Sequence, residues 1–129
     1  MANVAAITFT PKRARNVRKV VADCFSAADG SCSIGTSLLS GYFLREVVIN
    51  PDGPDAPTAA WDLTITQEDG LDILGAQGAN LSETATVSKS LYRGGAVVER
   101  LPVYGIVTIN ITNGGDGKKV QISLVGADN

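Results

Sequence analysis

The chain has 129 residues and a mass of 13.4 kDa, with 44% hydrophobic residues, 19% charged residues and a formal net charge of −2. This length and composition are those of one folded globular domain. Histidine is absent, which removes the commonest general base and the commonest metal ligand of proteins. We therefore expect a protein that is not an enzyme and holds no metal or other cofactor. A general nucleic-acid binder normally carries a basic excess, so we expect no sequence-specific binding of nucleic acid.

The two cysteines, Cys24 and Cys32, flank a turn-like segment of small and polar residues. Two cysteines do not make a disulfide framework, and a bridge between them stays open at this point. The N-terminus lacks a charged segment followed by a long apolar run, so we expect no signal peptide. No stretch is long and apolar enough for a transmembrane helix. These features favour synthesis in a reducing cytoplasm with free thiols.

The first quarter of the chain predicts two strands. Residues 5–10 are rich in β-branched and aromatic residues and end at Pro11. Residues 16–25 alternate between two faces. One face holds Val17, Lys19, Val21, Asp23 and Phe25, and the other holds Arg18, Val20, Ala22 and Cys24. A helix over residues 12–28 is the competing interpretation, because Ala, Arg and Lys are good helix formers. The adjacent Val20 and Val21, together with Phe25, favour the strand.

Further strands are expected between turns that are rich in Gly, Pro, Ser and Asp. Trp61, Leu63 and Ile65 alternate with polar residues and should point into the core. In the segment 83–92 the best strand signal is 84–87, and Gly94-Gly95 ends it. The expected strands are residues 41–50, 61–66 and 83–92, and the expected turns and connections are residues 28–33, 51–57, 67–70 and 75–80.

The strongest pattern is a pair of alternating segments, residues 103–112 and 118–125, around the loop 113–117. Asn and Gly in this loop tolerate the positive φ of a tight turn, so we expect a β-hairpin. Its inward residues would be Val107, Ile109 and Ile111 opposite Val120, Ile122 and Leu124.

These short strands predict an all-β fold, an antiparallel β-sandwich or small barrel of immunoglobulin-like or jelly-roll-like type. We expect one compact domain, with an N-terminal arm and the first strands in residues 1–40 and the sandwich body in residues 41–129. The apolar segments at Gly41–Phe43 and 103–107, with Leu38-Leu39, exceed what a small core requires. A symmetric oligomer or a larger shell would bury this excess. The alternative is that they simply form the core.

Three carboxylates, Glu68, Asp69 and Asp72, lie within five residues. Such a cluster could hold calcium, but the distal Glu and the ligand register of a calcium loop are missing. The sequence therefore favours a hairpin turn set by Asp69-Gly70, with Asp72 facing solvent. No acid pair stands out for glycoside hydrolysis, and no serine or cysteine has a histidine to activate it.

Five of the 11 basic residues lie within eight positions, and they are Lys12, Arg13, Arg15, Arg18 and Lys19. One interpretation is a solvated face, since charged residues are mostly exposed. The other is a docking arm for an acidic protein surface or for packaged nucleic acid. No aromatic residue is interleaved before Phe25, so base stacking is disfavoured and a protein partner fits better.

The turn-and-strand pattern of residues 38–82 and 101–125 resembles a family of small tailed-bacteriophage proteins encoded among virion structural genes. The elements that carry the resemblance are the strand 41–50, the Pro/Gly/Ala-Pro loop 51–57, Trp61-Asp62, the turn 68–74, the Gly-Ala-Asn at 78–80 and the final segment 103–125. They cover more than half of the chain and are structural motifs without catalytic groups.

The resemblance implies a non-enzymatic virion component, first of all a capsid cement (decoration) protein. Such a protein binds between major-capsid subunits, sits on the capsid surface after assembly in the bacterial cytoplasm, and is a homo-oligomer, most often a trimer. The alternatives are a neck or tail connector or a baseplate or fibre adaptor. A carbohydrate- or receptor-binding module is a further alternative, in which Trp61 or Tyr92 would face a sugar.

Overall fold

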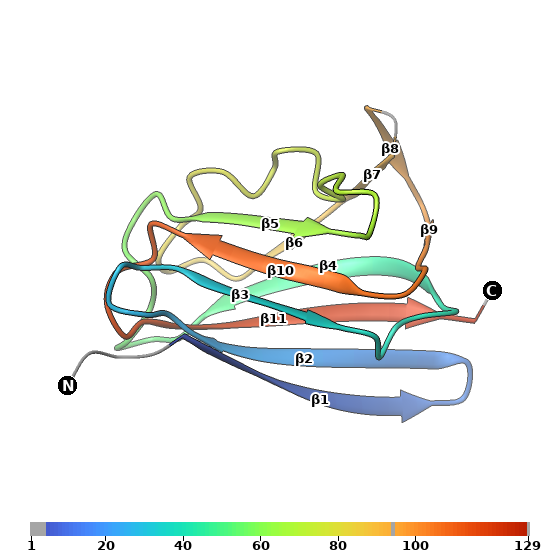
Figure 1. Ribbon diagram of the computed structural model, residues 1–129, viewed down its shortest axis with the longest axis horizontal. Coiled ribbons are helices and arrows are strands. Elements are labelled where there is room, and N and C mark those ends of the chain that lie inside the picture. Colours follow the sequence, from blue (N-terminus) through green and yellow to red (C-terminus); the bar gives the residue numbers. More distant parts are fainter. Residues whose placement is uncertain (1–4, 94, 129) are drawn as a thin grey trace.

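The computed structural model describes residues 5–93 and 95–128, and within them it contains strands, turns and loops but no helix. Every strand pairing is antiparallel, which confirms the predicted all-β, sandwich-like fold. The strands, labelled in Figure 1, are β1 (Ala6–Ala14), β2 (Val17–Phe25), β3 (Cys32–Thr36), β4 (Phe43–Pro51), β5 (Asp62–Thr66), β6 (Val87–Lys89), β7 (Leu91–Arg93), β8 (Ala96–Val98), β9 (Leu101–Pro102), β10 (Val107–Thr112) and β11 (Lys119–Ala127).

The strands form two layers and a small ribbon. The larger sheet has the order β1-β2-β11-β4-β6, and β9 also pairs with β4. The second sheet, β3-β10-β5, lies over it, and the β7-β8 ribbon stands at one corner (Figure 1). Strands from residues 1–40 therefore enter both sheets: β2 pairs with β11, and β3 pairs with β10.

The core between the two sheets is filled by the inward faces that the alternation predicts. Trp61, Leu63 and Ile65 are at most 1% exposed, so the prediction that they point inward is confirmed. The two predicted rows of the C-terminal segments are also buried, and they are Val107, Ile109, Ile111, Val120, Ile122 and Leu124. Burial of these side chains supplies most of the drive for folding.

The predicted C-terminal hairpin is wrong. β10 lies between β3 and β5, while β11 lies between β2 and β4, so the loop between them carries the chain from one sheet to the other. This loop is anchored on the N-terminal half: Gly114 N–H donates to the Gly30 carbonyl at 3.0 Å, and Lys118 N–H donates to Ser26 Oγ at 2.9 Å. Alternation shows which face of each strand points inward, but it does not show whether the two strands are neighbours in one sheet or lie in two sheets that face each other across the core.

The N-terminal segment forms a hairpin, and the alternative helix over residues 12–28 is wrong. β1 continues through Pro11 to Ala14, beyond the end that we expected at Pro11. Ala14 and Val17 close the two-residue turn, so by the antiparallel alternation Pro11 sits at a position whose N–H side faces away from β2. An edge strand tolerates proline at such a position. The predicted strand 16–25 is confirmed as β2.

Other boundaries differ from the expectation. β3 was not predicted, and it begins inside the expected turn 28–33. The segment 83–92 contains the short strand β6 and the start of β7, and of its best strand signal, 84–87, only Val87 belongs to a strand. Residues 103–106 form a loop, because Gly105 adopts a φ of +67°, a conformation outside the β region.

The free edge of β5 is covered by the chain segment that follows it. Leu63 N–H donates to the Gly78 carbonyl at 2.7 Å, Ile73 N–H donates to the Ile65 carbonyl at 2.8 Å, and Leu81 N–H donates to the Trp61 carbonyl at 2.7 Å. This cover satisfies the edge groups, which would otherwise be open to pairing with another chain. Gly78 approaches so closely that a Cβ there would overlap the carbonyl of Leu63.

We expect Gly78→Ala to lower the free energy of unfolding by about 2–3 kcal/mol, since the added methyl group must push two backbone segments apart. Urea unfolding followed by the fluorescence of the buried Trp61 measures this loss. Gly53→Ala is the matched control, because nothing lies within 4 Å of its Cβ position, and it should change stability by less than about 0.5 kcal/mol. Equal effects of the two substitutions would contradict the close packing of Gly78.

Candidate docking site

The basic cluster lies at the turn end of the β1–β2 hairpin, where the register places like charges opposite one another. Lys12 pairs with Lys19, and Arg13 pairs with Arg18, with Arg15 in the connecting turn. Directly opposed like charges destabilise a strand pair. Lys12, Arg13, Arg15 and Lys19 are all exposed, and none of the four forms an ion pair with a described residue. Five cations are therefore gathered on one projecting end of the large sheet.

Arg18 differs from the other four because it is held against the body of the protein. Its Nη1 donates to the Leu38 carbonyl at 2.6 Å, and its guanidinium lies 4.8 Å from the centroid of the Tyr42 ring. Its Nε is buried without a hydrogen-bond partner among the described residues. These contacts direct the Arg18 side chain away from Arg13, and they attach β2 to the segment that contains Leu38 and Tyr42. The candidate docking surface therefore consists of the other four residues, Lys12, Arg13, Arg15 and Lys19, which we call the basic tip.

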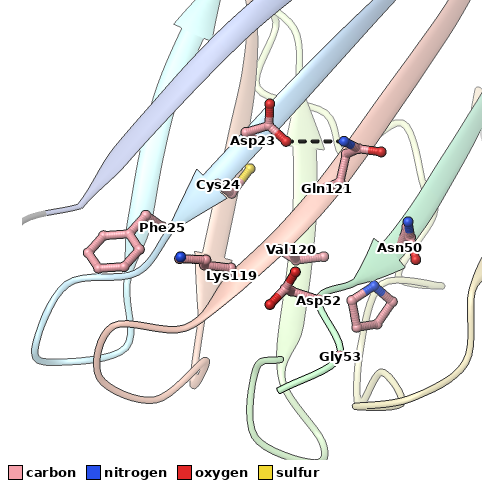
Figure 2. A pocket seen from close by; sticks show the side chains of 10 residues that line it. Asp23, Cys24, Phe25, Asn50, Asp52, Gly53, Lys119, Val120 and Gln121 are labelled. Carbon is pink, nitrogen blue, oxygen red and sulfur yellow. Dashed lines mark hydrogen bonds between the residues drawn. The ribbon is translucent and has the colours of Figure 1, made fainter. Parts of the chain in front are cut away.

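A second feature is a hollow of about 590 Å³ on the outer face of the large sheet, at the far end of β2 (Figure 2). It is lined by outward-facing side chains of three neighbouring strands and by the loop after β4. Asp23 on β2 accepts a hydrogen bond from Gln121 Nε2 on β11 at 3.1 Å. Lys119 and Asp52 add one charge of each sign. This mixture is typical of the solvated face of an antiparallel sheet.

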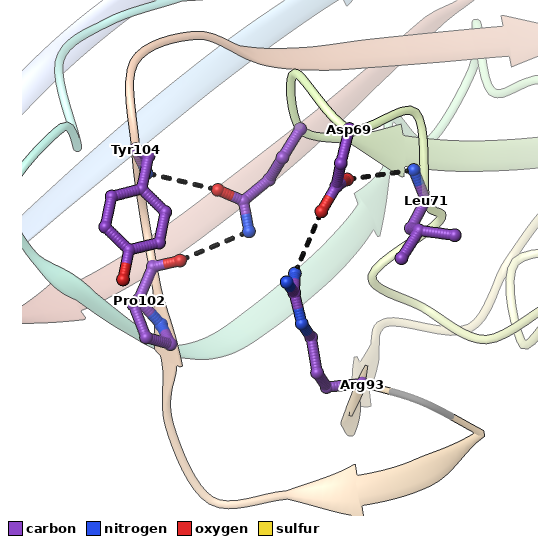
Figure 3. A network of polar contacts seen from close by, with 6 residues as sticks. Asp69, Leu71, Arg93, Pro102 and Tyr104 are labelled. Atoms are coloured by element: carbon purple, nitrogen blue, oxygen red, sulfur yellow. Dashed lines mark hydrogen bonds and ion pairs between the residues drawn. The ribbon is translucent and has the colours of Figure 1, made fainter.

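The acidic turn after β5 is a structural turn, as predicted, but Asp72 does not face solvent. Asp72 is half-buried, and its carboxylate accepts three backbone N–H groups at 3.1–3.2 Å, from Ile65, Leu74 and Ala76. Asp69 accepts from Leu71 N–H and forms an ion pair with Arg93 at 3.0 Å (Figure 3). The carboxylates thus point to different partners. No group of three or more acidic or cysteine side chains within the described ranges could hold a metal ion.

Asp62, the first residue of β5, joins three segments of the chain. One carboxylate oxygen accepts from Asn80 N–H at 2.9 Å, and the other accepts from Asn113 Nδ2 at 2.7 Å. These hydrogen bonds favour the charged form and lower the pKa of Asp62 below its ordinary value of 3.8. Asp62 therefore ties the cover of β5 to the loop that crosses between the sheets.

The cysteines are free and buried, Cys24 on β2 and Cys32 on β3. Burial raises the pKa of both thiols, and in Cys24 the neighbouring Cys32 and Asp23 raise it further. Both therefore stay protonated at neutral pH and pack as small apolar side chains.

The aromatic residues weighed for a sugar site are not presented for stacking. Trp61 is fully buried, and its Nε1 donates to the Ser82 carbonyl at 3.0 Å. Tyr92 is half-buried, and its ring packs on Gly75. The exposed aromatic residue is Tyr104, with 69% of its surface accessible. Tyr104 belongs to the apolar segment 103–107, whose alternation predicts a continuous strand.

No protein-family model, curated protein or solved structure matches the chain. None of the described segments is a helix that could span a membrane.

We expect Lys12→Glu to raise the free energy of unfolding by about 0.5–1 kcal/mol at low salt, since it replaces a like-charge pair with an opposite-charge pair. Thermal or urea unfolding at low and high salt measures the gain, which should shrink as salt screens the charges. Lys89→Glu is the control, because Lys89 pairs with the apolar Val47. A Lys12→Glu protein no more stable than this control would contradict the repulsion.

The lowered pKa of Asp62 predicts part of the acid sensitivity of the fold. A carboxylate whose pKa is lower in the folded state stabilises the protein above pH 3.8 and loses this contribution as the pH falls through the folded pKa. Asp62→Asn should therefore lose less stability than the wild type between pH 5 and the acid limit. Urea unfolding over this range measures the slopes, with Asp55→Asn, an exposed turn residue, as control. Parallel slopes for the wild type and Asp62→Asn would refute this role.

Proposed function

We propose that this chain is a non-enzymatic structural protein of a tailed-bacteriophage virion, and that it acts as a capsid cement protein. It binds at junctions between major-capsid subunits on the capsid surface and stiffens the head. The resemblance of its strand-and-turn pattern to small virion proteins supports the assignment to the virion. The arrangement of charge on the β1–β2 hairpin supports the mode of binding.

The observation that carries the proposal is the basic tip. Lys12 and Lys19 are opposed on neighbouring strands, and Arg13 and Arg15 lie beside them, in a chain whose net charge is nevertheless −2. Cations held close together at a cost in stability gain the most when an anionic surface neutralises them. An acidic groove between capsid subunits supplies this neutralisation, and it lets one copy contact two subunits at once.

The rest of the fold suits a clamp of this kind. The hairpin is continuous with the large sheet, because β2 pairs with β11 over nine residues. A rigid element loses little conformational entropy on binding. Pro11 and the charges of the basic tip also protect β1, the edge strand, from pairing with other strands. The hairpin end therefore offers side-chain charge rather than backbone groups to its partner.

Substitution of Lys12, Arg13 and Lys19 by Glu should lower the affinity for the virion by about tenfold, since each of the three surface charge pairs contributes about 0.2–1 kcal/mol. The measurement is rebinding of purified protein to virions of the encoding phage that lack it, at low and high salt. Lys89→Glu is the control. Unchanged occupancy by the triple variant would rule out the basic tip as the docking surface.

Copy number in purified virions tests the assignment itself, by quantitative mass spectrometry. A number comparable with that of the major capsid protein is expected of a cement protein. A number far below it would move the protein to the neck, the tail or a fibre, and absence from the virion would refute the virion assignment.

A further inference from the structure

A second surface, which shares no residue with the basic tip, exposes apolar side chains around an ion pair. Tyr104 is 69% exposed, Leu71 is 54% exposed and Ile106 is 48% exposed. Arg93 lies between the two ends of this surface, because it lines one hollow with Leu71 and another with Tyr104. Figure 3 shows the ion pair of Arg93 and Asp69 between the two apolar side chains. We call these five residues the Tyr104–Leu71 surface.

Hydrogen bonds hold the backbone around Tyr104 in place. The buried side chain of Gln67 donates from Nε2 to the Pro102 carbonyl and accepts from Tyr104 N–H, both at 3.2 Å (Figure 3). The residues on either side of Tyr104 are also held. Val103 is buried and its N–H donates to the Tyr42 carbonyl, and Gly105 N–H donates to Ser40 Oγ at 3.0 Å. The tyrosine ring is therefore held out by an anchored loop.

The next residue, Gly105, is closely packed in this loop. Gly105 has a φ of +67°, and the carboxylate of Glu68 occupies the space that a Cβ would need. The same carboxylate accepts from Ile106 N–H at 3.4 Å. No hydrogen bond joins the Tyr104 hydroxyl to a described residue. A preorganised, exposed tyrosine beside an arginine has the composition of an interface centre.

The charge pattern of the surface is complementary to itself. Its centre holds one cation and one anion, Arg93 and Asp69, and its two ends are the exposed side chains of Tyr104 on one side and Leu71 on the other. A two-fold axis through the centre turns each end onto the opposite end. Arg93 then faces Asp69 of the second copy, and Tyr104 faces its Leu71. Opposite charges then meet at the centre, while Arg100, which lines the hollow beside Tyr104, lies over the Phe43 ring.

From this pattern we infer that the Tyr104–Leu71 surface joins two copies of the chain in a two-fold dimer. The partner is a second copy because each element of the surface finds its complement on the same surface. The arrangement is two-fold, unlike the trimer that the resemblance to cement proteins implies. The dimer does not depend on capsid binding, because the Tyr104–Leu71 surface contains none of the four residues of the basic tip.

The test uses purified protein without virions, in sedimentation equilibrium at increasing concentration. We expect a species of twice the 13.4 kDa chain mass. Tyr104→Ser should raise the dimer dissociation constant at least about tenfold. The control Val17→Ser, at a side chain 41% exposed elsewhere on the molecule, should leave the constant unchanged. The fluorescence of the buried Trp61 verifies that each variant is folded.

A charge exchange tests the two-fold contact directly. Arg93→Glu leaves only acidic groups at the centre of the surface, and Asp69→Arg leaves only basic ones, so each variant alone should be monomeric. An equimolar mixture of the two should form a one-to-one dimer, because opposite charges then meet across the axis.

The inference is overturned by a wild-type monomer up to about 1 mM, by a trimer or larger species, or by a dimer that these substitutions leave intact. It is also overturned if the mixture stays monomeric. Each of these outcomes leaves capsid binding through the basic tip standing, so the two proposals fail separately.

Discussion

The last strand, β11, makes the contact on which the rest of the molecule depends. It pairs with β2 on one side and with β4 on the other, so it joins the N-terminal hairpin to the middle of the chain. Its inward side chains Val120, Ile122 and Leu124 are at most 3% exposed and face the second sheet across the core. Hydrogen bonding within the sheet and apolar burial between the sheets thus meet in one strand. Without β11, β2 and β4 would each present an unpaired edge to water and to other chains.

Much of the fold follows from alternation, which is a local property. Trp61, Leu63 and Ile65 point inward because every second residue of a strand faces the same side. The partner of a strand is not a local property, and the C-terminal segments show this most clearly. Val107–Thr112 and 118–125 have the pattern of a hairpin, yet they lie in different sheets. The Asn- and Gly-rich loop tolerates many backbone conformations and so does not distinguish a turn within a sheet from a crossing between sheets.

The candidate sites were predictable to different degrees. The basic cluster is visible in the sequence. That Arg18 contacts the body of the protein instead of facing a partner depends on Leu38 and Tyr42, which are more than 15 residues away in the chain. The part played by Asp72 depends on backbone groups that only the folded turn gathers. The sequence marks 103–107 as an apolar segment but does not show that Tyr104 is its exposed member, because Val103 and Val107, on either side of it, are buried. A positive φ at Gly105 breaks the strand between them, and many glycines in strand-like segments do no such thing.

The position of β11 sets the order in which the fold can be completed. Residues 17–25 must wait for residues 119–127, which are synthesised much later, before their second neighbour exists. Until then the nascent chain holds one hairpin and several strands without a closed core. Such long-range pairing slows folding, because the entropy of closing a long loop is lost before the contacts form. Before the native sheet is complete, the proline of β1 and the charges that surround it already hinder pairing of the nascent chain with other chains.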